Sequence, residues 1–194
     1  MTKISIESTL KNITPEQYEL KTYDEAFLAR VYADPRVTQA LTRGPATVEW
    51  SPDHTQFKRT VTMTPHPTGS FAQILGRLGG GLDYLEKVDT TFGNNPLRTW
   101  NTPSVVKPDQ IYGSGTFEFL PVPGVPNSVH FKISGTVTAD LPWYQSWLNS
   151  SVESAIVGMT QESYKAVILA TQDIIDADLA AASAATGANV GNAA

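Results

Sequence analysis

The sequence predicts one α+β domain in which a curved antiparallel β-sheet wraps around a long C-terminal α-helix. Two observations lead to this fold class. After a short helical stretch near the start, the middle of the chain alternates with the two-residue period of strands, whereas apolar residues after Pro142 recur about every 3.6 positions. Because strands and helices occupy separate parts of the chain, the strands should pair antiparallel rather than form parallel βαβ units.

The first forty residues predict a strand followed by helices. Residues 3–7 alternate apolar and polar side chains, as a half-buried strand does. Thr14 is a suitable cap and Pro15 suits the first helical turn, so a helix should begin there and end near residues 34–35, since a residue before proline avoids helical geometry. A short second helical piece is expected over residues 37–41.

The middle of the chain should supply the sheet. Alternating apolar residues and turn-forming residues predict six further strands, at residues 47–50, 56–63, 82–92, 97–101, 112–120 and 129–139. The segment from Phe71 to Gly81 is either a helix or a strand. A curved sheet covered by one helix leaves a gap between them, which is the default place for a ligand.

The C-terminal part predicts one helix from about Tyr144 to Leu179, roughly 50 Å long at 1.5 Å per residue. Its apolar stripe should pack on the sheet through Val152, Ile156, Met159 and Val167. Residues 180–194 are mostly Ala, Gly, Asn and Ser and predict a disordered tail. The expected organisation is therefore a ligand-binding domain over residues 1–179 and a tail over residues 180–194.

Composition excludes several functions. The 194 residues carry a net charge of −5 without a basic cluster, so nucleic acid is not an expected partner and any membrane contact should be transient. The chain has no cysteine, which rules out disulfides and thiolate chemistry. The N-terminus lacks an apolar segment typical of a signal peptide, and this favours a cytoplasmic location. The sequence does not indicate an oligomeric state.

One resemblance bears on function. The stretch Asp140-Leu141-Pro142-Trp143-Tyr144-Gln145-Ser146-Trp147-Leu148, followed by Val152-Glu153 and Glu162-Ser163-Tyr164-Lys165, is similar to the end of VASt-type sterol-binding domains. The order of elements resembles the START-like superfamily, which includes birch-pollen allergen-type proteins, polyketide cyclases and lipid-transfer domains. This resemblance implies a helix-grip fold that holds a hydrophobic ligand between sheet and helix.

Arg59 is the candidate polar anchor. It shares a strand face with Phe57, Val61 and Met63, so an inward-facing register would bring its guanidinium into the core, where it needs a partner. Glu86 lies on the apolar face of its own strand and is the expected partner. The alternative is that the register is reversed, or that Arg59 reaches the sheet edge and is solvated.

Aromatic and small side chains complete the candidate site. Gly115 has the same inward parity as the neighbouring aromatic residues, as do Gly113 and Gly135, and these glycines should leave room for a ligand. The remaining candidates are core residues in the alternative interpretation, and Trp147 could instead form a rim or touch a membrane. They are Tyr84, Trp100, Phe117, Phe131, Ile133, Trp147, Ile156 and Met159.

No catalytic motif is present, and His54, His66 and His130 lack the spacing of metal ligands, so we expect neither a metal nor another cofactor. The favoured function is binding or transfer of a lipid-like or aromatic molecule. One alternative is a cyclase or hydratase that uses Glu86, Tyr84 or Asp89 as acid or base. Another is a groove for a partner protein's helix, which would be open, whereas a ligand would need a closed cavity of several hundred Å³.

Overall fold

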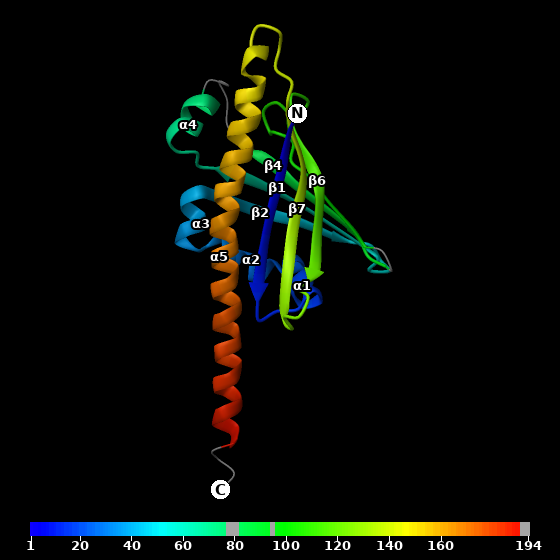
Figure 1. Cartoon of the computed structure of the whole chain (residues 1–194). Helices are drawn as coiled ribbons and strands as arrows, with labels where there is room; N and C mark the ends of the chain where they lie inside the picture. Colours follow the sequence, from blue (N-terminus) through cyan, green and yellow to red (C-terminus); the bar gives the residue numbers. More distant parts are fainter. Residues whose placement is uncertain (77–81, 94–95, 191–194) are drawn as a thin grey trace.

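The computed structural model describes the backbone of residues 1–76, 82–93 and 96–190, and side chains as far as residue 185. It confirms the α+β class: seven antiparallel strands form one curved sheet in the order β1-β7-β6-β5-β4-β3-β2 (Figure 1). The strands are β1 (Thr2–Lys11), β2 (Leu41–Trp50), β3 (Gln56–Pro65), β4 (Tyr84–Thr91), β5 (Leu97–Asn101), β6 (Ile111–Pro121) and β7 (Ser128–Ala139).

Helices cover one side of this sheet. The long helix α5 (Asn149–Val190) contacts β1 and β7, and its C-terminal part continues past the end of the sheet (Figure 1). The shorter helices are α1 (Pro15–Tyr23), α2 (Glu25–Tyr32), α3 (Pro35–Ala40) and α4 (Gly69–Gly76). Helices α2, α3 and α4 contact α5, whereas α1 contacts β6 and β7. The arrangement is a helix-grip fold, with the core between sheet and helices.

The first helical stretch is interrupted, contrary to the single helix expected there. Thr14 and Gln17 form the predicted capping box at the start of α1. The backbone of Asp24 is extended, and its side chain accepts a hydrogen bond from the backbone N–H of Ala26, so it caps a second helix. A short acidic side chain that bonds to the nearby backbone favours a helix start over a helix interior, which explains the break.

Helix α5 ends eleven residues later than predicted, at Val190 instead of Leu179. Alanine has the highest helix propensity, so an Ala-rich segment continues a helix without burying side chains. The last buried side chain of the described part is Ile175, and residues 180–185 are exposed. Residues 191–194 of the expected tail lie outside the described residues. At its other end, α5 begins at Asn149 after a 3₁₀ turn over Ser146–Leu148.

Strand β2 differs from the expected range, and the segment that the sequence left ambiguous is a helix. Strand β2 begins at Leu41, six residues early, with an irregular register between Arg43 and Ala46 that accommodates Gly44-Pro45. The ambiguous segment after Gly69 is the helix α4, which ends at Gly76, and residues 77–81 lie outside the described part of the chain. Because α4 packs against α5, it closes one end of the space beneath the sheet.

Candidate functional site

Two pockets lie between the inward face of the sheet and the helices. The first, here called the Trp100 pocket, has a volume of about 100 Å³ and is bounded by β1, β4, β5, β6, β7, α4, α5 and the chain between β5 and β6. Most of its surface is apolar. Its lining includes Ile4, Ile6, Leu75, Leu82, Tyr84, Glu86, Trp100, Thr102, Ile111, Ile133, Val137, Ile156, Met159, Thr160 and Tyr164.

The second pocket, here called the Arg59 pocket, has a volume of about 90 Å³. It lies toward α1 and α2, which cover the sheet where α5 does not. Its lining includes Tyr18, Tyr23, Phe27, Tyr32, Arg59, Glu86, Val88, Arg98, Phe117, Phe119, Phe131, Ile133, Tyr164, Val167 and Ile168. Glu86, Ile133 and Tyr164 line both pockets, so these three side chains form the partition between them.

Nine of the eleven predicted site residues line these pockets. Tyr84, Trp100, Ile156 and Met159 belong to the Trp100 pocket, whereas Arg59, Phe117 and Phe131 belong to the Arg59 pocket. Glu86 and Ile133 stand in the partition between them. Alternation in strands and helical spacing in α5 therefore identified which side chains face inward, but not that they divide between two small spaces.

Trp147 lines neither pocket, and the prediction that places it there is wrong. Its side chain is 69% exposed, while the next residue, Leu148, is buried. Both residues lie in the 3₁₀ turn before α5, where neighbouring side chains point in different directions, so only one of them can face the core. The apolar contact of this turn is made by Leu148 with the cluster around α4.

Gly115 also lines neither pocket, and it does not leave room for a ligand. It pairs directly with Gly135 across β6 and β7, and a Cβ atom added at either glycine would overlap a carbonyl oxygen of the facing strand, on Ser134 or Ser114. The space above Gly113 and Gly135 is filled by the Trp100 ring, whose Cζ3 lies 2.9 Å from the place of a Gly113 Cβ atom. Gly115 and Gly135 therefore accommodate a close strand contact, whereas Gly113 lies against the Trp100 ring and lines the Trp100 pocket.

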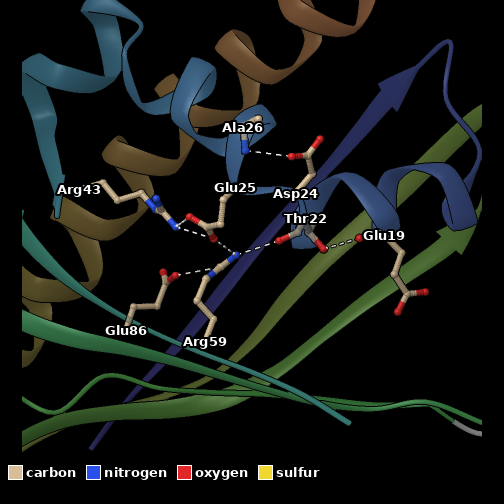
Figure 2. Close-up of polar contacts among 8 residues, drawn as sticks. All are labelled: Glu19, Thr22, Asp24, Glu25, Ala26, Arg43, Arg59 and Glu86. Atoms are coloured by element: carbon tan, nitrogen blue, oxygen red, sulfur yellow. Dashed lines mark hydrogen bonds and ion pairs between the residues drawn. The ribbon is translucent and has the colours of Figure 1, made fainter. Parts of the chain in front are cut away.

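Arg59 faces inward and pairs with Glu86, as the strand alternation predicts. The Arg59 Nη2 atom donates to Glu86 Oε1 at 3.1 Å, and Nη1 donates to the backbone oxygen of Thr22 at 2.8 Å. Figure 2 shows a second pair beside it, in which Arg43 Nη2 donates to both oxygens of Glu25 at 2.6 and 2.9 Å. Two cations and two carboxylates thus balance each other, which satisfies charges that would otherwise be costly in a buried place.

Ionisation of the surrounding groups follows from their burial. Burial opposes the positive charge of Arg59, but the carboxylate of Glu86, with smaller effects from Tyr32 and Glu25, outweighs this and raises the pKa of the guanidinium. Burial and then the charge of Glu86 raise the pKa of both Tyr84 and Tyr164 well above the usual value. Both phenols therefore stay protonated at neutral pH, and neither is a base there.

Two buried donors next to the pockets lack a partner among the described residues. They are the indole N–H of Trp100 and the Nε of Arg59. Trp100 is 8% exposed and forms part of the wall of the pocket named after it. A buried donor without an acceptor is energetically costly, and in proteins such groups commonly meet a ligand or an ordered water.

Tyr164 and Tyr32 were missed as site residues. Tyr164 stands in the partition between the pockets, and Tyr32 lines the Arg59 pocket beside the charge network. Helical spacing was available as a signal for Tyr164, since Ile156, Thr160 and Tyr164 follow each other at four-residue intervals on one face of α5. No local signal marked Tyr32, because α2 turns toward the sheet only after the break at Asp24.

The described residues contain no group of three or more His, Asp or Glu side chains arranged to hold a metal ion. Within the same ranges, every helix is too short or too polar to span a lipid bilayer.

Comparison with known proteins supports the fold alone. No family model and no curated protein matches this sequence. Among solved structures, TTHA0849 from Thermus thermophilus is similar, with a TM-score of 0.54 and 12% identity over 89% of this chain and 98% of that chain. Ms6760 from Mycobacterium smegmatis has a TM-score of 0.50 and 13% identity over 89% of each chain.

Proposed function

We propose that this protein binds a small apolar molecule in the space between the sheet and α5. The observation that carries the proposal is the pair of adjoining, largely apolar pockets that share Glu86, Ile133 and Tyr164. Protein interiors are normally packed without spaces of this size, and apolar spaces bind apolar molecules. Membership of the START-like superfamily, with ligand transfer as the biological role, is part of this proposal.

The pocket volumes set the size of the ligand. Each pocket is smaller than the several hundred Å³ expected from the sequence, and smaller than the roughly 150 Å³ engineered cavity that holds one benzene ring. Together the two volumes exceed that benchmark. The ligand is therefore of single-ring size, or it spans both pockets when the side chains of the partition move. A sterol would require a much larger rearrangement of the core.

The alternative functions receive less support. Asp89 is exposed on the outer face of β4, away from the pockets, and Tyr84 stays protonated, so it is not a base at neutral pH. Glu86 is engaged with Arg59. A partner helix would need an open groove, but α1, α2 and α4 already cover the space beside α5.

Methyl NMR with toluene as the probe tests the proposal. The protein would be labelled at the methyl groups of isoleucine and methionine, because six such residues line the Trp100 pocket: Ile4, Ile6, Ile111, Ile133, Ile156 and Met159. We expect saturable shifts of these signals and a rise in melting temperature by mass action. Uniform weak shifts over the whole protein, without saturation, would contradict binding in the pocket.

A matched pair of variants on α5 locates the probe. Ile156→Phe adds bulk inside the Trp100 pocket and should weaken toluene binding at least tenfold. Leu169→Phe adds a similar ring on the same helix, where the side chain is 54% exposed, and should leave binding as in the parent. Equal effects of the two substitutions would refute the assignment. Native mass spectrometry of protein purified from its own source would then identify the natural ligand.

A further inference from the structure

Two polar side chains in the wall of the Trp100 pocket, Trp100 and Glu86, indicate the chemistry of a ligand there, provided that the proposed function holds. Trp100 lies on β5 directly opposite Val88 on β4, and Glu86 precedes Val88 by two residues, so both side chains leave the sheet on its inner face. Two residues in this diagonal relation on neighbouring strands are about 7–8 Å apart. One ligand atom between their side chains can therefore contact both.

These two side chains offer complementary hydrogen bonding. The buried indole N–H of Trp100 is a donor without an acceptor among the described residues. Glu86 is 7% exposed and accepts from Arg59 through Oε1, while no described residue donates to its second oxygen. The wall of this largely apolar pocket therefore includes a buried donor and a buried carboxylate that each lack one partner, beside hydroxyl-bearing residues such as Tyr84, Thr160 and Tyr164.

We propose that the ligand carries a hydroxyl group on an apolar body of ring size, as an alcohol or a phenol does. A hydroxyl oxygen accepts a hydrogen bond from the indole N–H, and its proton is donated to the Glu86 carboxylate. A pure hydrocarbon satisfies neither group. A ketone or ether satisfies only Trp100, since it has no proton to donate, and an ammonium group satisfies only Glu86.

The size of the pocket agrees with this class of ligand. About 100 Å³ accommodates little more than a small ring or a short branched chain, so one hydroxyl group is enough to pair with both the Trp100 indole and Glu86. The neighbouring Arg59 pocket contains the other unpaired donor, the Nε of Arg59, which offers a second oxygen a place if a longer ligand crosses the partition.

Phenol and toluene test the proposal because they have nearly the same shape and differ in one hydroxyl group. We expect phenol to bind about tenfold more tightly than toluene, since hydrogen bonds to charged and buried groups are worth about that factor. Toluene is the more hydrophobic molecule, so a pocket without polar recognition would show the reverse order.

The indole signals of the tryptophans provide a direct readout on the unmodified protein. As phenol saturates the pocket, the indole N–H resonance of Trp100 should move downfield, because this N–H becomes a hydrogen-bond donor. Toluene accepts no such hydrogen bond, so it should cause a smaller shift that is not downfield. Trp50, Trp143 and Trp147 are 43%, 87% and 69% exposed and serve as internal controls whose indole signals should not change. The Arg59→Met/Glu86→Leu double variant removes the acceptor and should reduce the ratio of phenol to toluene affinity to about one.

The outcomes separate the two proposals. If toluene binds but phenol binds no more tightly and the Trp100 indole signal does not shift, the hydroxyl assignment is overturned and apolar binding stands. If neither probe causes saturable shifts, both proposals fall. If phenol is preferred and the double variant keeps that preference, Glu86 is not the acceptor and the assignment is likewise overturned.

Discussion

Replacing Arg59 with methionine would separate its charge from its bulk, because the two side chains have similar length. The substitution leaves Glu86 without its charge partner in a place where this residue is 7% exposed. It also removes the N–H that donates to the Thr22 carbonyl oxygen. Glu25 keeps its hydrogen bonds to Arg43, so the second pair of the network stays intact.

The expected loss of unfolding free energy is about 3–5 kcal/mol, the usual cost of leaving one charge of a buried pair without its partner. The double variant Arg59→Met/Glu86→Leu removes both charges and should lie within about 2 kcal/mol of the parent, since apolar replacements of a buried ion pair are often neutral. The remaining cost comes from the unpaired Thr22 carbonyl group, at about 1 kcal/mol.

Chemical denaturation of the parent, both single variants and the double variant gives the four corners of a double-mutant cycle. The double variant should be more stable than Arg59→Met alone, because it leaves no unpaired buried charge. Two results would refute it: a loss below about 1 kcal/mol in Arg59→Met, which would mean that the pair is solvated, or losses that simply add in the double variant, which would mean that the two side chains do not interact.

Three further predictions use other parts of the structure. Gly135→Ala should destabilise the domain by more than about 2 kcal/mol, because the added methyl group meets the Trp100 ring and the facing strand; an unchanged melting temperature would show that this packing is wrong. Deleting residues 180–194 should change the unfolding free energy by less than about 0.5 kcal/mol, since residues 180–185 are exposed; urea denaturation would reveal a larger loss. The pKa values of Tyr84 and Tyr164 are raised in the folded state, so their contribution to stability is complete below pH 10 and should be lost as pH rises above it; denaturation between pH 8 and 11 should show this fall, and a flat profile would contradict it.

Several features of the candidate site follow from local patterns. Side chains alternate along any strand, so the apolar neighbours of Arg59 placed its guanidinium inside, and Glu86 was the available carboxylate on the next strand. The apolar stripe of α5 likewise follows from the helical period. Each of these predictions depends on residues within a few positions of each other, and the structure agrees with them.

Other features depended on contacts between distant segments. The alternation of residues 112–120 indicated that Gly115 faces inward. Whether an inward-facing glycine leaves a space depends on which other groups fill the place of its missing side chain. Around these glycines the backbone of β7 and the indole of Trp100 fill it. The position of Trp147 depended on how the turn before α5 meets α4. Neither contact has a signature near the residue concerned.

The sequence by itself determined the α+β class, the antiparallel sheet, the packing of a long helix on it and the inward direction of the charged pair, because periodicity is a property of the local backbone. Only the tertiary structure decided that, within the described residues, the space between sheet and helices forms two small adjoining pockets that share Glu86, Ile133 and Tyr164. The physical reason is that the free volume of a core is a small difference between two large volumes: the volume that the sheet and helices enclose and the volume of the side chains that fill it. Both volumes depend on the positions of all the elements together.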